Sequence, residues 1–252
     1  MSTPQFIVSP EALSGSRATL TGQELHHLRV RRLRAGSEVV LCDARGSQRH
    51  GVVLSIDRHC ATIGLSSTPA QQRESPLQLV LAQALLKADK LDLIIEKATE
   101  LGVSGVVLFS SERSAGRVTA DRQARWNRIA RGATKQCQRS TAPSVAGPIS
   151  FDELLSQHTA AQRLFFWEDA PPGGLAAAHA ECPRTAWALV VVGPEGGFSA
   201  AEAQRAAAAG FRLIGLGPRI LRAETAAVIA VALTQFLWGD MADGAPRISE
   251  TA

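Results

Sequence analysis

Two loops hold the residues best suited to chemistry. The first, Gly193-Pro-Glu-Gly-Gly-Phe-Ser199, follows the apolar run Ala188–Val192 and leads into the helix-start pattern Ser199-Ala-Ala-Glu202. Glycines let the backbone approach a ligand closely, and a helix N-terminus adds partial positive charge. A tight turn alone would not explain three glycines beside a proline and a glutamate, so the pattern favours a ligand-binding loop. The alternative, in which Glu195 only caps its own loop, stays open. The loop fits neither the dinucleotide fingerprint nor a phosphate loop.

The second loop, Gly217-Pro-Arg-Ile-Leu-Arg-Ala-Glu-Thr225, follows the apolar run Phe211–Leu216. Two arginines and a glutamate among apolar residues are costly to desolvate without mutual pairing or a ligand. Either Arg219 or Arg222 pairs with Glu224, or a ligand engages them. In an open parallel sheet, ligands bind beyond the carboxyl ends of the strands. We therefore expect both loops to serve one ligand site.

The elements that must position these loops fall into two groups. Up to about Leu65 the chain shows short strands separated by turns, which predict a small β-barrel: Phe6–Val8, Glu38–Cys42, Gly51–Ile56 and Ala61–Leu65. Thr21-Gly-Gln-Glu24 has capping-box spacing and predicts a short helix to about Val30, and Asp43–Gly46 predicts a hairpin turn. Ser66–Pro76 is polar and proline-flanked, as a linker would be.

After this segment, apolar runs of strand length alternate with helical patterns. The predicted strands are Leu77–Leu85, Val106–Phe109, Arg163–Trp167, Trp187–Val192 and Phe211–Leu216. The predicted helices are Lys90–Leu101, Arg122–Gln138, a helix bounded by Ser199 and Gly210, and Thr225–Trp238. Such alternation is typical of a mostly parallel α/β domain. In the first helix we interpret the charged residues as surface ion pairs rather than catalytic groups: Lys90, Glu96, Lys97 and Glu100.

Length and composition agree with a folded chain of two domains. The 252 residues are 45% hydrophobic and 20% charged, which excludes disordered and fibrous classes. We predict domains at residues 1–68 and 77–240, a linker at 69–76 and a flexible tail at 241–252. The start lacks a signal-peptide pattern, and no apolar run is long enough to span a membrane, so we expect a cytoplasmic protein. The spacing of the four cysteines and six histidines favours neither disulfides nor a metal site.

The combination of Gly193–Gly197 with Leu216–Ala226 (LGPRILRAETA) resembles the ribosomal RNA small-subunit methyltransferase E family of the SPOUT superfamily. The resemblance extends to Lys87–Asp92, Glu96–Val103, Glu112–Ser114, Trp126…Lys135-Gln-Cys137…Arg139 and, in the small domain, His27–Gly36. It implies a PUA-like barrel followed by a SPOUT-type α/β domain with a C-terminal trefoil knot, although knots are rare. It further implies a homodimer that uses S-adenosylmethionine to methylate N3 of one uridine in 16S rRNA of the small ribosomal subunit.

The resemblance also implies which residues form the site. The cofactor would be held by the loops after three strands, through Trp167, Glu168, Gly193, Pro194, Glu195, Gly196, Gly197, Leu216, Gly217, Ile220, Leu221 and Arg222. Because uridine N3 carries a proton at neutral pH, the enzyme must remove that proton or stabilise the resulting anion. Glu224 and Arg222 are the first catalytic candidates, followed by Arg219 and Arg113, and the proton acceptor stays open.

Basic residues would hold the RNA through its phosphates. The candidates are Arg29, Arg31, Arg32 and Arg34 in the small domain and Arg128, Arg131 and Lys135 on one face of the helix Arg122–Gln138. The apolar side of that helix, which includes Trp126 and Ala133, is more typical of core or dimer contact. Two other functions stay open: a SPOUT methyltransferase that modifies a ribose 2′-hydroxyl or another RNA position, and a non-catalytic RNA-binding factor for ribosome assembly.

Overall fold

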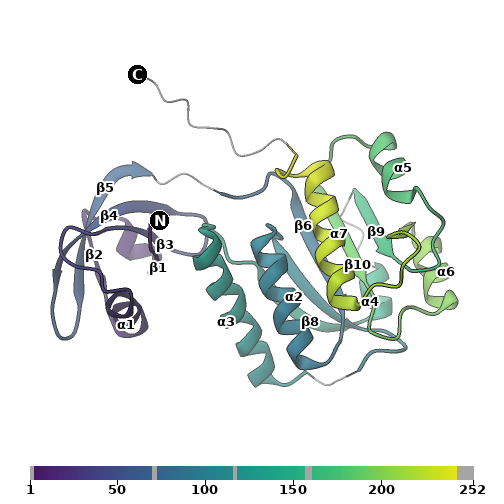
Figure 1. The fold of residues 1–252 in the computed structure, drawn as a ribbon, viewed down its shortest axis with the longest axis horizontal. Coiled ribbons are helices and arrows are strands. Elements are labelled where there is room, and N and C mark those ends of the chain that lie inside the picture. The colour runs from purple at the N-terminus through teal and green to yellow at the C-terminus, as the bar shows by residue number, and fades with distance from the viewer. Residues whose placement is uncertain (1–2, 70–72, 116–117, 157–160, 243–252) are drawn as a thin grey trace. The chain divides into compact units, whose positions relative to one another are not determined.

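In the computed structural model, shown in Figure 1, the described residues are 3–69, 73–115, 118–156 and 161–242. They form two units that do not follow the order of the sequence. The first unit contains the described residues up to Glu74 together with Arg131–Ala142, and the second contains Ser75–Ala130 and the described residues from Pro143 onward. The sequence had instead led us to expect residues 131–142 in the C-terminal domain. The predicted tail lies outside the described residues after residue 242.

The first unit is a five-stranded sheet with strand order β1-β3-β4-β5-β2. Its elements are β1 (Gln5–Ile7), a 3-10 helix (Pro10–Leu13), β2 (Arg17–Leu20), α1 (Gly22–Val30), β3 (Glu38–Cys42), β4 (Gln48–Ile56) and β5 (Ala61–Pro69). β1 runs parallel to β3 and the other pairs are antiparallel. Phe6, Leu28, Leu41 and Ile63 are among the fully buried residues of its core. The four predicted strands are confirmed. β2 was not predicted, because it has only four residues and only two of them, Ala18 and Leu20, are buried.

Two local expectations for this unit were wrong. Thr21 is the N-cap residue of α1, but its side chain makes no capping hydrogen bond, so the predicted capping box does not form. Glu24, its expected partner, forms an ion pair with Lys135 instead. β5 also continues to Pro69, and the strand therefore runs into the segment that was predicted as linker from Ser66.

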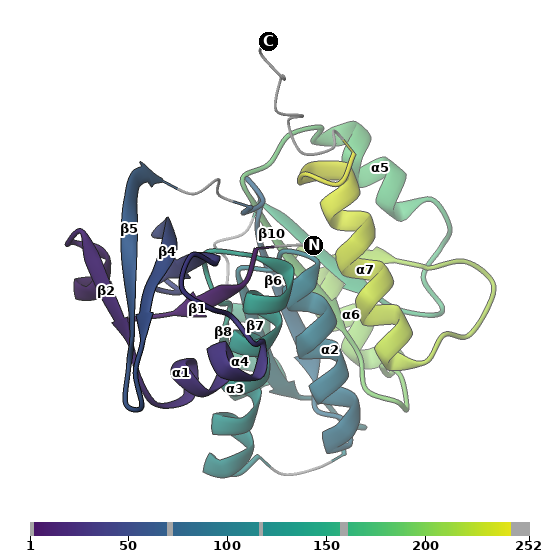
Figure 2. The same ribbon diagram turned by 60° about the vertical axis from the view of Figure 1, so that its left-hand side comes forward.

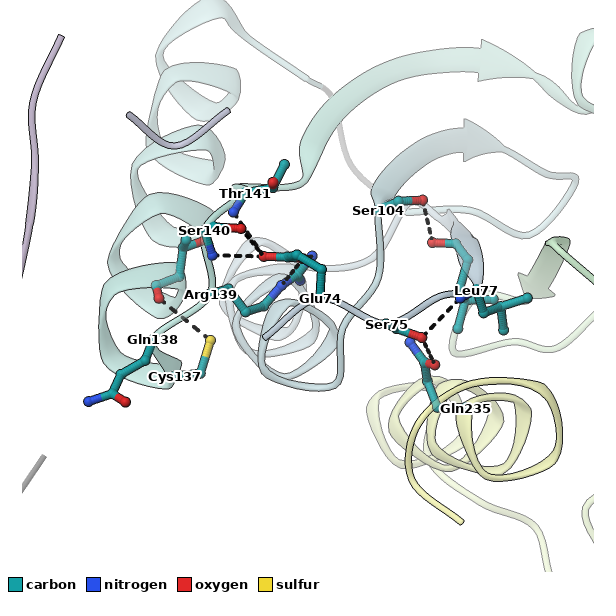
Figure 3. A network of polar contacts seen from close by, with 12 residues as sticks. Glu74, Ser75, Leu77, Ser104, Cys137, Gln138, Arg139, Ser140, Thr141 and Gln235 are labelled. Atoms are coloured by element: carbon teal, nitrogen blue, oxygen red, sulfur yellow. Dashed lines mark hydrogen bonds and ion pairs between the residues drawn. The ribbon is translucent and has the colours of Figure 1, made fainter. Parts of the chain in front are cut away.

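The carboxylate of Glu74 is the centre of the contacts that hold the residues directly after α3 (Ala120–Cys137) in the first unit. Glu74 accepts hydrogen bonds from the Arg139 guanidinium at 3.0 and 2.7 Å and from the backbone N–H groups of Ser140 and Thr141 at 2.8 and 2.9 Å (Figure 3). The Arg139 side chain is only 5% exposed. Gln5 completes the network by donating to the Arg139 carbonyl at 2.7 Å. We call this set the Glu74 network.

The second unit is built on a six-stranded sheet with strand order β11-β9-β10-β6-β7-β8, in which all pairs are parallel. Its strands are β6 (Gln78–Ala84), β7 (Gly105–Ser110), β8 (Ser144–Ser150), β9 (Gln162–Phe166), β10 (Trp187–Val192) and β11 (Arg212–Ile214). Its other helices are α2 (Ala88–Glu100), α4 (Phe151–Ser156), α5 (Gly174–Glu181), α6 (Ala200–Ala208) and α7 (Ala223–Trp238). The predicted parallel α/β arrangement is confirmed. β8 was not predicted, because this edge strand includes Gly147 and Pro148 and has few apolar residues.

Alternate residues of the central strands supply two separate apolar layers. Leu79, Leu81 and Val190 face the layer that also includes buried residues of α2, α5 and α7, and Figure 2 shows α2 beside α7. Val191 and Phe165 face the opposite layer, with residues of α4 and α6. Burial on both faces explains why these strands read as continuous apolar runs.

Among the residues described, every helix is too short or too polar to cross a membrane.

Candidate functional site

A cavity of about 210 Å³ lies where β9, β10 and β11 end. Because these strands are parallel neighbours in the sheet, the segments that follow them meet at one edge. We call them the tryptophan loop (Trp167–Asp169), the glycine loop (Gly193–Gly197) and the arginine loop (Leu216–Arg222). The wall is formed by Phe166, Trp167, Glu168, Val192, Gly193, Pro194, Glu195, Gly196, Gly197, Phe198, Ile214, Leu216, Gly217, Arg219, Ile220, Leu221, Ala223 and Ala226.

Every cofactor-binding residue predicted from the sequence lines this cavity except Arg222. Arg222 is the exposed N-cap residue of α7, and its neighbours Leu221 and Ala223 form the wall there. The apolar lining from the strand ends and from the start of α7, such as Phe166, Ile214 and Ala226, was not predicted. The only signal for these residues was their position directly beside the loops.

The glycine loop requires glycine at one position in particular. Gly197 has a φ of +67°, and a Cβ on this residue would overlap with the Oε1 atom of Glu168 in the tryptophan loop. The loop turns through a hydrogen bond from the Gly197 N–H to the Pro194 carbonyl at 3.0 Å. Directly after it, Ser199 and the buried Glu202 form the predicted capping box of α6. A left-handed glycine turn and a capped helix start therefore follow one another.

Side chains from two other strands hold the glycine loop in place. The fully buried Gln83, near the end of β6, donates from Nε2 to the Gly193 carbonyl at 3.1 Å. Arg113, from the loop after β7, donates from Nη1 to the Gly196 carbonyl at 2.9 Å. Arg113 was predicted as a catalytic candidate, and the structure places its guanidinium on the backbone of this loop.

Lys90 brings together two acidic residues at the cavity. Its Nζ atom lies 3.1 Å from Oε1 of Glu195 in the glycine loop and 3.6 Å from Oε2 of Glu224 in the first turn of α7. The hydrogen bond that Lys90 donates to Glu195 is the main reason that the pKa of this lysine lies above its ordinary value. The interpretation of Lys90 as a surface ion pair was therefore wrong.

The neighbouring Lys97 behaves as that interpretation predicted. It contacts Glu96 and Glu100 of its own helix at 2.8 and 2.9 Å.

A pair between Glu224 and Arg219 or Arg222 had also been left open. Glu224 faces Lys90 instead, and its Oε2 atom is shielded from solvent.

The predicted RNA-binding arginines of the first unit differ in their contacts. Arg29 donates to the carbonyls of Asp57 and Arg58 at 2.6 and 2.9 Å, in the turn between β4 and β5. Arg31 donates from Nε to Nε2 of His27 at 2.9 Å. Partial burial of the His27 ring, followed by the charge of Arg31, lowers the pKa of that histidine.

Arg32 and Arg34 are exposed, and so are Arg128 and Arg131 on α3. Lys135, the third member of the predicted basic face, forms the ion pair with Glu24 described above. Trp126 is 1% exposed and belongs to the core of the second unit, which confirms the core interpretation for this residue. The exposed arginines are thus the better placed candidates for phosphate contacts.

Comparison with known proteins covers both units. Residues 73–235 match the family described as the RNA methyltransferase domain, and residues 20–65 match the RNA methyltransferase PUA domain. The chain is similar to ribosomal RNA small subunit methyltransferase E of Bacillus subtilis, with 31% identity over 236 residues, or 88% of this chain and 92% of the relative.

Two solved structures are similar over nearly their whole length. A ribosomal RNA small subunit methyltransferase E from Neisseria gonorrhoeae, bound to S-adenosyl methionine, has 32% identity and a TM-score of 0.84, covering 95% of this chain and 100% of that chain. A methyltransferase from Legionella pneumophila, in complex with the same cofactor, has 26% identity and a TM-score of 0.83, covering 96% and 100%.

Proposed function

We propose, on the premise that this chain belongs to the ribosomal RNA small subunit methyltransferase E family, that it methylates N3 of one uridine in 16S rRNA. The coarser activity, S-adenosylmethionine-dependent methylation of RNA, follows from the family itself. The observation that supports uridine N3 as the methylated atom is that the glycine loop and the arginine loop line one cavity. The arginine loop has the sequence form that resembles the uridine-N3 enzymes specifically.

The residues present fit S-adenosylmethionine. Apolar walls at Phe166, Ile214 and Leu221 suit a flat adenine ring, and the glycine loop exposes backbone groups close to the cavity. Glu168 and Glu195 line the same cavity, where carboxylates can accept hydrogen bonds from ribose hydroxyls or from an ammonium group. When bound, the cofactor supplies an electrophilic methyl group on a sulfonium.

The charged residues beside the cavity can handle the uridine proton. Glu224 lies in the first turn of α7 with its carboxylate facing Lys90, and we assign it the acceptance of the N3 proton, directly or through a water molecule. Arg222 is exposed just before that helix, and Arg219 lines the cavity. A guanidinium aimed at a uracil carbonyl oxygen would stabilise the negative charge that develops when N3 loses its proton.

Exposed residues outside the cavity support the proposed partners. Arg32, Arg34, Arg128 and Arg131 would contact RNA phosphates, which position a nucleic acid without reading its sequence. Leu93 of α2 and Leu233 and Phe236 of α7 are 44%, 36% and 54% exposed, on two helices that pack together.

An apolar face of this kind is typical of an interface, and we propose that it forms a homodimer. We further propose that the protein acts in the cytoplasm, where small subunits are assembled.

We also propose that the chain closes its second unit with a trefoil knot. β11 lies at the edge of the sheet, whereas α7, which follows it in sequence, packs against the central strands β10 and β6. The chain must therefore return from the edge to the middle, as a knotted path requires. The arginine loop is the segment that makes this return.

The decisive experiment maps the product. Purified protein and isotope-labelled S-adenosylmethionine are incubated with 16S rRNA that lacks the modification, as assembled small subunits and as naked RNA. Nucleoside mass spectrometry should find one N3-methyluridine. A label on a ribose oxygen would instead support the 2′-hydroxyl alternative, and cofactor or RNA binding without any label would support a non-catalytic assembly factor.

Single-turnover methylation with Glu224→Gln and Arg222→Ala tests the catalytic assignments. We expect each rate to fall by about 10²-fold or more, the usual contribution of a general base or of a charge-stabilising group. Arg184→Ala is the control, because Arg184 is exposed and precedes β10, at the opposite end of that strand from the cavity. Rates near that of the unmodified protein in both test variants would remove these residues from the mechanism.

A further inference from the structure

Lys90 contacts both acidic segments of the candidate site although it comes from neither. It lies in the first turn of α2, which follows the central strand β6. Its two partners belong to separate segments of the site, because Glu195 is in the glycine loop, which lines the cavity, and Glu224 is in the first turn of α7, between the lining residues Ala223 and Ala226. One ammonium group thus spans the gap between the loop that follows β10 and the helix that follows the arginine loop.

The two carboxylates need this cation. The distances from Nζ place the oxygens of Glu195 and Glu224 within about 7 Å of each other, and like charges at such a separation repel. The side chains of Lys90, Glu195 and Glu224 are 29%, 27% and 15% exposed, so solvent screens the repulsion only in part. Lys90 therefore offsets the repulsion between the glycine loop and the first turn of α7.

We propose that Lys90 is a positioning residue of the methyltransferase site, which fixes the glycine loop against the first turn of α7. The proposal rests on the proposed function, because the site that Lys90 organises is the one assigned to S-adenosylmethionine and uridine. Its hydrogen-bonding distance to Glu195, which lines the cavity, predicts an effect on cofactor affinity. Its proximity to Glu224 predicts an additional effect on the methylation rate.

Lys97 offers a matched control on the same helix. It also contacts two carboxylates, but Glu96 and Glu100 lie on α2 itself. Lys97→Met therefore removes one lysine and two ion pairs from α2 without disconnecting any part of the cavity. A difference between the two methionine variants reports what Lys90 does beyond local helix stabilisation.

The test measures equilibrium binding of S-adenosylmethionine and of S-adenosylhomocysteine to the purified full chain, by dialysis or calorimetry, beside the unfolding midpoint. We expect Lys90→Met to weaken cofactor binding about tenfold, the loss typical of a charge-assisted hydrogen bond. Lys90→Arg should recover binding to within about threefold, and Lys97→Met should bind as the unmodified protein does. All three should keep similar unfolding midpoints.

Two further measurements separate positioning from general destabilisation. If Lys90→Met does not fold, Lys90→Gln and Glu195→Gln are measured in its place, because both remove the ion pair between Lys90 and the glycine loop. In a double-mutant cycle, Lys90→Met should cost less affinity in the Glu195→Gln background than alone, since one of the repelling charges is already gone. Additive effects in that cycle would overturn the proposal.

The outcomes distinguish the two proposals. If the unmodified protein binds the cofactor and methylates rRNA while Lys90→Met binds equally tightly, only the role of Lys90 is overturned. If the unmodified protein binds the cofactor but methylates no uridine, the proposed reaction fails and the binding results still decide the role of Lys90. A protein that binds no S-adenosylmethionine overturns both.

Discussion

At the scale of the residue, sequence patterns identify some groups of the site and miss others. The glycine loop and the arginine loop stand out in the sequence, and nearly all of their predicted cofactor-binding residues line the cavity. Lys90 lies in a stretch that carries the family resemblance, but no local pattern links it to its partners, which lie more than about a hundred residues further along the chain. Only the tertiary fold brings them together. The sequence also could not show which glycine of the glycine loop adopts a positive φ and lies against the Glu168 carboxylate.

The overlap between Gly197 and Glu168 leads to a prediction at this scale. Gly197→Ala should weaken S-adenosylmethionine binding at least tenfold, because a Cβ in this left-handed conformation is strained and also displaces the Glu168 carboxylate. Gly217→Ala is the comparison, since Gly217 has a φ of +92° but a Cβ on it would meet no other part of the chain within 4 Å. Calorimetric binding should show that adding Glu168→Ala relieves part of the Gly197→Ala defect, and no relief would argue against the steric explanation.

At the scale of the element, the same capping-box spacing occurs at two helix starts but forms a capping box at only one of them. Thr21 and Ser199 each stand three residues before a glutamate, but only Ser199 and Glu202 form a capping box. Glu24 is engaged by Lys135, a tertiary contact that no local pattern contains. Long apolar strands were likewise predictable from periodicity, whereas the short strand β2 and the edge strand β8 were not, because few of their side chains enter a core.

The two helix starts predict different responses to the loss of a hydroxyl. Ser199→Ala should destabilise α6 by about 1 kcal/mol, because the Glu202 N–H loses its side-chain acceptor. Thr21→Ala should leave the stability of α1 nearly unchanged. Hydrogen exchange read separately at the first amides of each helix measures both effects, and equal losses of protection would contradict the assigned caps.

At the scale of the whole molecule, the division into two units could be predicted only in part. The change from short antiparallel strands to alternating strands and helices indicates two domains, and the structure has two units. The return of residues 131–142 to the first unit was not predictable, because nothing in the sequence marks Arg139, directly after the predicted helix Arg122–Gln138, as a buried residue. In the structure it is a buried partner of Glu74, and this contact joins two distant parts of the chain.

The Glu74 network should therefore matter for the stability of the first unit. Glu74→Ala removes the acceptor of two backbone N–H groups and the carboxylate beside a buried guanidinium, which should cost about 2 kcal/mol in the free energy of unfolding. Glu181→Ala, which removes the exposed pair with Arg212, should cost less than about 1 kcal/mol. Urea unfolding followed by circular dichroism compares the two, and equal costs would rule out a special role for the network.

The position of α7 in the cavity wall has a consequence for protein synthesis. Ala223 and Ala226 complete a cavity whose other walls come from the ends of β9, β10 and β11 and the loops that follow them, and α7 is the last helix among the described residues. A nascent chain that still lacks α7 therefore has an incomplete pocket, however well its earlier strands have folded. The ribosome must therefore translate the chain through α7 before the pocket is complete, so a translation product that stops before this helix would not compete for the cofactor.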